Sequence, residues 1–122
     1  HDANGLLIGP GEPRPDLTVV VVDDDGGGIF STLEYGEPAR SATPEAAAAT
    51  ERLFGTPHGT DLAALCAAHG VRHARPGTVD ELRDALSQVS DGIQVIVVPV
   101  DRQQHRRTRK RLLDVVVTSR GQ

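Results

Sequence analysis

The sequence lacks the features that define several large classes of protein. Its single cysteine cannot build a disulfide framework, so we expect a reducing, cytoplasmic compartment. No apolar run approaches the roughly 18 residues that a membrane span needs, and no signal-peptide pattern opens the chain. We therefore expect a soluble protein that has no membrane partner.

The sequence also lacks an excess of positive charge, with 13 lysines and arginines against 17 aspartates and glutamates. The formal net charge of -4 argues against a general nucleic-acid-binding protein, which needs a positive field over much of its surface. One basic cluster near the end of the chain has no interleaved aromatic side chains, so it predicts a solvated helix face rather than a nucleic-acid site. This cluster consists of Arg102, Arg106, Arg107, Arg109, Lys110 and Arg111.

The length of 122 residues allows one domain at most, which is small for an enzyme that must also enclose a complex substrate. The chain begins at His1 rather than at a methionine, and a helix signal follows within a few residues. We therefore expect a piece of a longer protein, cut within a domain.

Aliphatic runs alternate with helix signals along the chain, which is typical of α/β proteins. Residues 17–22 and 93–98 are aliphatic apart from Thr18 and Gln94 and show no polar alternation, and such runs predict parallel strands that helices cover on both faces. Between them we expect a long irregular loop at about 37–58, with at most one short helix. The other expected elements are a helix over 61–69 with Thr60 as its N-cap, a strand over 71–74, a helix opened by a capping box at Thr78 with Leu82, Ala85, Leu86 and Val89 buried, and a final helix over 102–116.

Three aspartates and then three glycines follow the first predicted strand. Ligands of open α/β sheets bind at the carboxyl ends of strands, so Asp23, Asp24 and Asp25 stand where a site is expected. The glycines at 26–28 allow the backbone to turn sharply and to approach a ligand closely. Carboxylates in this place indicate a metal site, and a solvated acidic turn is the plain alternative.

Several kinds of site share part of this pattern. A dinucleotide-binding loop would need a third glycine, and Val21 and Thr32 stand where an EF-hand loop has its first and last ligands. Phosphatases of the haloacid dehalogenase type and receiver domains of response regulators also place aspartates after a strand. Both need a well-placed lysine, and the single lysine, Lys110, falls in the predicted final helix. A magnesium-dependent phospho-aspartate domain of either type stays as the alternative.

A diphosphate cofactor held by magnesium explains why aspartates and glycines follow one another here, because the cation bridges carboxylate and phosphate oxygens. Three stretches carry a resemblance to a family with this chemistry: Asp2 with Gly5-Leu6-Leu7, Val21-Val22-Asp23-Asp24-Asp25-Gly26-Gly27-Gly28-Ile29-Phe30, and Leu53-Phe54-Gly55-Thr56-Pro57-His58 with Asp61-Leu62. They resemble the 2-succinyl-5-enolpyruvyl-6-hydroxy-3-cyclohexene-1-carboxylate synthases, thiamine-diphosphate enzymes of menaquinone biosynthesis. The resemblance covers nearly the whole chain, and only the stretch around 40–50 is longer than expected.

The resemblance implies a transferase that decarboxylates 2-oxoglutarate and adds the succinyl carbanion equivalent to isochorismate. The chain would be the C-terminal part of its diphosphate-binding domain, an incomplete α/β domain with a parallel sheet flanked by helices. In this superfamily the cofactor lies between domains of two subunits, so we expect at least a dimer in the full-length protein. The catalytic glutamate belongs to the other domain, so the chain alone is expected to be inactive.

The resemblance also implies roles for single residues. The Asp24 side chain and the Gly26 carbonyl would bind Mg²⁺, with Asp25 and Gly27 also at the thiamine diphosphate. The first half of the motif, a Gly-Asp pair, would precede His1. The family commonly has asparagine at one or more of the places held by Asp23 and Asp25. Ile29, Phe30 and Leu33 would form an apolar wall beside cofactor and substrate, although the residues alone leave a core role equally open.

Overall fold

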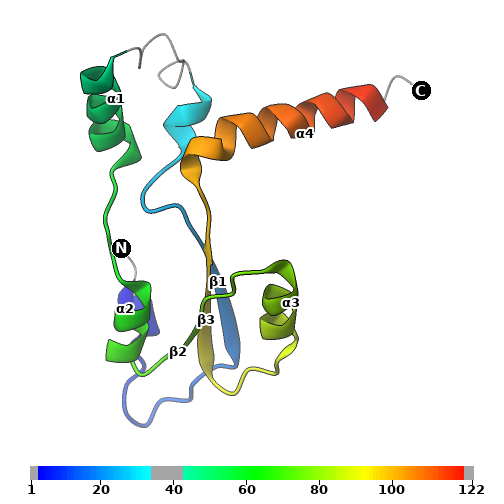
Figure 1. Ribbon diagram of the computed structural model, residues 1–122. Coiled ribbons are helices and arrows are strands. Elements are labelled where there is room, and N and C mark those ends of the chain that lie inside the picture. The colour runs from blue at the N-terminus through cyan, green and yellow to red at the C-terminus, as the bar shows by residue number, and fades with distance from the viewer. Residues whose placement is uncertain (1–2, 34–42, 120–122) are drawn as a thin grey trace. The chain divides into compact units, whose positions relative to one another are not determined.

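The computed structural model describes residues 3–33 and 43–119 of the chain (Figure 1). The chain divides into two compact units, and each is considered by itself. The first, here the sheet unit, comprises residues 1–23 and 60–99. The second, here the acidic-loop unit, comprises residues 24–59 and 100–122.

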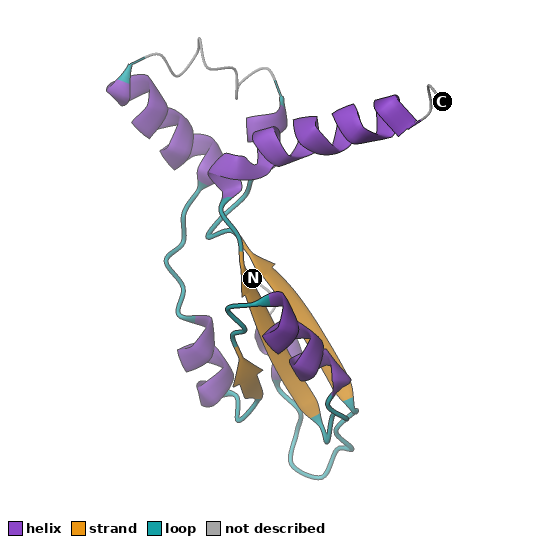
Figure 2. Ribbon diagram, turned by 45° about the vertical axis from the view of Figure 1, so that its right-hand side comes forward, coloured by secondary structure: helices purple, strands orange, loops and turns teal. Residues whose placement is uncertain are grey.

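Three parallel strands form the sheet of the first unit (Figure 2). They are β1 (Leu17–Asp23), β2 (Arg72–Ala74) and β3 (Ile93–Pro99), in the order β1-β3-β2. The register pairs Leu17 with Ile93 and Asp23 with Pro99, so β1 and β3 end together. This arrangement confirms the α/β class with a parallel sheet and all three predicted strands.

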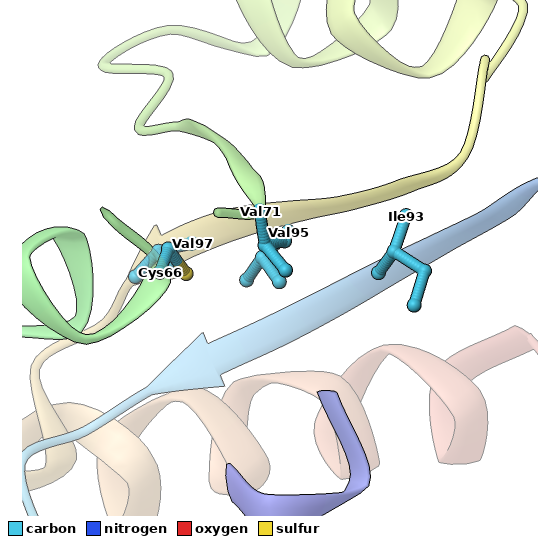
Figure 3. Packing of buried hydrophobic residues seen from close by; sticks show 5 residues of the cluster. All are labelled: Cys66, Val71, Ile93, Val95 and Val97. Carbon is cyan, nitrogen blue, oxygen red and sulfur yellow. The ribbon is translucent and has the colours of Figure 1, made fainter. Parts of the chain in front are cut away.

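The core of the sheet unit lies around β3, of which five successive residues are buried. Val95 and Val97 pack with Val71 and with Cys66 of helix α2 (Leu62–Ala68), as Figure 3 shows. Partly buried side chains from β1, from α2 and from the first 3-10 helix, η1 (Ala3–Leu6), complete the cluster. Cys66 is thus a small apolar residue of the core rather than an exposed nucleophile.

The prediction that helices cover both faces is wrong for β1 in the described part of the chain. Val19 and Val21 pack against the core, but Val20 and Val22, on the opposite face, are 45% and 66% exposed. β1 is an edge strand here, and near its start the other face carries a polar contact instead: the Gln94 amide donates to the Thr18 hydroxyl at 2.7 Å. An aliphatic run thus predicts a strand more reliably than it predicts what covers that strand.

Helix α2 begins one residue later than predicted. Its N-cap is Asp61, whose carboxylate accepts a hydrogen bond from the Ala64 amide at 3.0 Å, so Thr60 is not the cap. Gly70, with φ of +63°, follows the C-cap and ends the helix as expected.

Helix α3 (Val79–Ser87) has the predicted N-cap, because the Thr78 hydroxyl accepts from the Glu81 amide at 3.2 Å. The Glu81 carboxylate accepts from the Gly77 amide at 2.7 Å, a variant of the capping box. The predicted buried stripe is only partly correct. Leu82 and Ala85 are half-buried, whereas Leu86 is 51% exposed and Val89, beyond the end of the helix, is 91% exposed.

The acidic-loop unit is more helical than the sequence predicts. Within the expected loop at 37–58, α1 (Pro44–Thr50) continues into a π-helix, η5 (Glu51–Gly55). The Thr43 hydroxyl caps α1 by accepting from the Ala46 amide, and proline at N1 followed by alanines favours a helix. The part of the expected loop at 37–42 lies outside the described residues. The unit's other elements are η2 (Ile29–Thr32), η6 (Arg102–Gln104) and α4 (His105–Ser119), close to the predicted final helix.

In the described ranges, no helix combines the length and apolar character that crossing a bilayer requires.

Replacement of Ile96 by alanine should destabilise the sheet unit, because this side chain is only 1% exposed on the central strand. We expect a loss of about 2–5 kcal/mol of unfolding free energy from the cavity that remains. Val89→Ala is the control, and a side chain that is 91% exposed should cost less than about 0.5 kcal/mol. Urea unfolding of the full-length protein measures both changes, and equal losses would contradict the packing around Ile96.

Candidate functional site

The acidic-glycine loop, residues 24–28, begins where β1 ends and leads into η2. Asp25 has a φ of +54° and Gly26 a φ of +147°, so two successive residues take backbone conformations that residues other than glycine rarely adopt. Aspartate tolerates the left-handed region better than most residues do. The turn predicted from the three glycines therefore starts one residue earlier, at Asp25.

The Asp25 carboxylate binds the chain's own backbone. It accepts hydrogen bonds from the amides of His58 at 3.2 Å and Gly59 at 2.7 Å, and it lies 3.5 Å from Nδ1 of His58. The Gly59 amide is the main reason why the pKa of the Asp25 carboxyl lies below its ordinary value. The carboxylate is therefore ionised at neutral pH, and the stability this contact contributes is lost only as the pH falls below the usual aspartate range.

Arg102 of η6 holds the backbone of the same loop. Its Nη1 donates to the carbonyl oxygens of Asp24 at 2.8 Å and Asp25 at 2.5 Å, and its Nη2 forms an ion pair with the Glu51 carboxylate. The Arg102 side chain is only 12% exposed. The prediction of a solvated basic face is thus wrong for Arg102, although Arg107 and other described basic residues of α4 are exposed.

Packing inside the unit requires glycine at positions 26 and 28 of the loop. A Cβ at Gly26 would clash with the Gly55 carbonyl oxygen and lie 2.6 Å from Nη1 of Arg102. A Cβ at Gly28 would clash with the imidazole of His105. The Gly27 amide donates to the Gly55 carbonyl at 2.9 Å, so a cofactor contact by Gly27 would have to use another atom.

Asp24 is half-buried, whereas Asp25 is exposed. No described residue donates a hydrogen bond to the Asp24 carboxylate or to the Gly26 carbonyl, whereas the Asp24 carbonyl is bound by Arg102. A carboxylate and a backbone carbonyl are oxygen donors of the kind that Mg²⁺ prefers, so these two residues fit part of a magnesium site. Across the described ranges, no three His, Cys, Asp or Glu side chains gather in a way that could hold a metal ion.

The predicted apolar wall lies on η2 and is not a buried core. Ile29, Phe30 and Leu33 are 68%, 37% and 45% exposed. The Phe30 ring packs against Phe54 of η5, with ring centroids 4.9 Å apart and planes inclined at 43°. Leu53, next to Phe54 in the sequence, is 59% exposed, so exposed apolar side chains precede both rings of this pair in the sequence.

Sequence reasoning missed the residues that support the loop from later segments of the chain. Phe54 stands in one of the matching motifs, but no role was predicted for it. Arg102 was grouped with its basic neighbours, although its position directly before the helix, next to Asp101, separates it from their periodic face. Glu51 and His105 carry no local signal, because their partners lie far away in the sequence.

Comparison of the sequence with known proteins shows the family of the chain. No family model matches the chain. A 2-succinyl-5-enolpyruvyl-6-hydroxy-3-cyclohexene-1-carboxylate synthase from Rhodococcus erythropolis is 59% identical over 103 residues, or 84% of this chain. The chain belongs to this synthase family. Synthases of the same name from Saccharopolyspora erythraea and Paenarthrobacter aurescens are 51% and 46% identical over 112 and 122 residues, which are 92% and 100% of the chain.

The matched part is a small share of each synthase. The chain spans 18% of the Rhodococcus erythropolis protein, 19% of that from Saccharopolyspora erythraea and 21% of that from Paenarthrobacter aurescens. It is therefore similar to about a fifth of a synthase, which agrees with the prediction of an incomplete domain.

Substitution of Gly26 by alanine should disturb the acidic-glycine loop, because the added methyl group would clash with the Gly55 carbonyl at a positive φ. Gly11→Ala is the matched control: Gly11 also has a positive φ, but nothing lies within 4 Å of an added Cβ. Backbone strain alone costs about 1–2 kcal/mol, so the Gly26 variant should lose more than this and the control no more. Thermal unfolding of the full-length protein compares them, and equal shifts would refute close packing at Gly26.

Proposed function

We propose that the chain is part of a thiamine-diphosphate-dependent transferase of menaquinone biosynthesis. The full-length protein would decarboxylate 2-oxoglutarate and add the succinyl carbanion equivalent to isochorismate. The observation that carries this proposal is identity of 46–59% to synthases over most of the chain, including all of it in one case. A cytoplasmic enzyme of at least two subunits, without a nucleic-acid or membrane partner, is part of the proposal.

In this proposal Asp24 and Gly26 contribute the metal ligands of the chain. The Asp24 carboxylate and the Gly26 carbonyl would hold Mg²⁺, and the cation would offset the repulsion between the aspartates and a diphosphate. No described residue donates a hydrogen bond to the Asp24 carboxylate, which supports this assignment. The neighbouring Asp25 carboxylate already accepts hydrogen bonds from two backbone amides. Asp25 then stabilises the loop through its hydrogen bonds from the His58 and Gly59 amides. Direct contacts of Asp25 and Gly27 with the cofactor stay predictions.

The apolar surface on η2 would form one side of the reaction space. Thiamine diphosphate, when bound, supplies the carbanion-stabilising chemistry. Ile29, Phe30 and Leu33 would keep water from that space, and exclusion of water would favour a decarboxylation. Their exposure supports this role, since a core role would require their burial, and Phe54 holds the Phe30 ring from one side.

The phospho-aspartate alternative has less support. A receiver domain or a haloacid dehalogenase-type enzyme needs a lysine beside its aspartates, and Lys110 is exposed on α4. Arg102, which does contact the loop, binds two carbonyls and the Glu51 carboxylate. Labelling of an aspartate by acetyl phosphate would favour the alternative, whereas protection by thiamine diphosphate that depends on magnesium would favour the synthase.

Replacing Asp24 by alanine in the full-length protein should abolish magnesium-dependent binding of thiamine diphosphate, because the only carboxylate assigned to the metal is removed. Asp84→Ala, on the exposed surface of α3, is the control for loss of one negative charge and should bind normally. Calorimetric titration of the apo protein with thiamine diphosphate, with and without Mg²⁺, gives both affinities. Unchanged affinity in the Asp24 variant would identify the aspartates as an acidic turn without a metal.

The 122 residues alone should neither catalyse the reaction nor bind thiamine diphosphate tightly. The chain presents two assigned metal ligands and no catalytic residue, and the proposed mechanism takes its remaining groups from other domains. Carboligation assays and cofactor titration of the isolated chain test this expectation, with the full-length protein as the positive control. Measurable turnover by the chain alone would contradict it.

A further inference from the structure

Arg102 differs from the basic side chains that follow it. Arg107, Arg109 and Arg111 are exposed along α4, whereas the Arg102 side chain is 12% exposed. A mostly buried guanidinium is retained where its charge is paired and its donors find acceptors. Both Nη atoms of Arg102 have acceptors, whereas its buried Nε has none within the described ranges. Here the partners are two successive backbone carbonyls of the acidic-glycine loop and one carboxylate of η5.

These contacts fix which oxygens of the loop remain for a cation. Nη1 of Arg102 occupies the carbonyls of Asp24 and Asp25, while no described donor binds the carbonyl of Gly26 or the carboxylate of Asp24. With the first two carbonyls turned to the guanidinium, the loop takes the positive φ values seen at Asp25 and Gly26. In the conformation that Arg102 contacts, neither assigned ligand accepts a hydrogen bond from the described residues.

The ion pair with Glu51 explains how a single side chain can hold the loop firmly. Glu51 opens η5, its backbone carbonyl accepts from the Thr56 amide at 2.9 Å, and its carboxylate also lies against Gly55. The Gly55 carbonyl in turn accepts from the Gly27 amide. The loop is thus attached to η5 twice, directly through Gly27 and indirectly through Arg102.

We propose that Arg102 is a positioning residue for the magnesium and diphosphate site, acting through the carbonyls of Asp24 and Asp25 and held in place by Glu51. This inference rests on the proposed function, because it assigns Asp24 and Gly26 to the metal. Arginine is needed for its planar fork of donors, which serves carbonyls and carboxylate at once. A lysine ammonium carries the charge but lacks that geometry.

The test uses the full-length protein and the variants Arg102→Ala and Arg102→Lys, with Arg107→Ala on the exposed face of α4 as the charge-matched control. The dissociation constant of thiamine diphosphate in the presence of Mg²⁺ is measured by calorimetry on the apo protein. We expect it to rise at least about tenfold for Arg102→Ala, less for Arg102→Lys, and not at all for the control. At saturating Mg²⁺ and cofactor, the turnover of the Arg102 variants should lie within about threefold of that of the unsubstituted protein, because a positioning residue changes cofactor affinity more than the rate of the chemical step.

Thermal unfolding of the apo variants separates positioning from general stability. If Arg102→Ala does not fold, Arg102→Lys carries the comparison. Unchanged cofactor affinity in a folded Arg102 variant overturns the inference, and so does an equal loss in Arg107→Ala. Asp24→Ala distinguishes the two levels: normal affinity in that variant removes the proposed metal site itself, whereas loss there with normal affinity in the Arg102 variants refutes only the role of Arg102.

Discussion

The acidic-glycine loop depends on its attachment to η5, made by the guanidinium of Arg102 and the carbonyl of Gly55. Asp24 and Asp25 of this loop follow Asp23 at the end of β1, and like charges so close together need a compensating charge and fixed backbone partners. Arg102 provides both, since it lies among two loop carbonyls and the Glu51 carboxylate. Asp25 adds a third attachment through the amides of His58 and Gly59.

This arrangement gives the aspartates different roles. The Asp25 carboxylate accepts hydrogen bonds within the chain, whereas no described residue donates one to the carboxylate of Asp24. Close packing within the chain already requires glycine at two positions of the loop. A Cβ at Gly26 would clash with Gly55 and Arg102, and a Cβ at Gly28 with His105. The hydrogen bonds from Arg102, Gly27, His58 and Gly59 hold the loop within the chain itself.

The sequence predicted the strands and the location of the loop because both follow from local patterns. The aliphatic runs of β1 and β3 and the cap at Thr78 need no knowledge of distant residues. The failures came from non-local effects. Whether Val20 and Val22 are covered depends on which elements pack there, and the burial of Arg102 depends on Glu51, half the chain away. Short helices such as α1 and η5 fell within a stretch whose prolines predicted a loop.

A crystal structure of the full-length protein with Mg²⁺ and thiamine diphosphate tests the central claim most directly. The account predicts a metal ion bonded to the Asp24 carboxylate and the Gly26 carbonyl, with Arg102 still on the carbonyls of Asp24 and Asp25. A metal ion bound elsewhere, or a loop in which these two carbonyls have left Arg102 when the cofactor is bound, would contradict it.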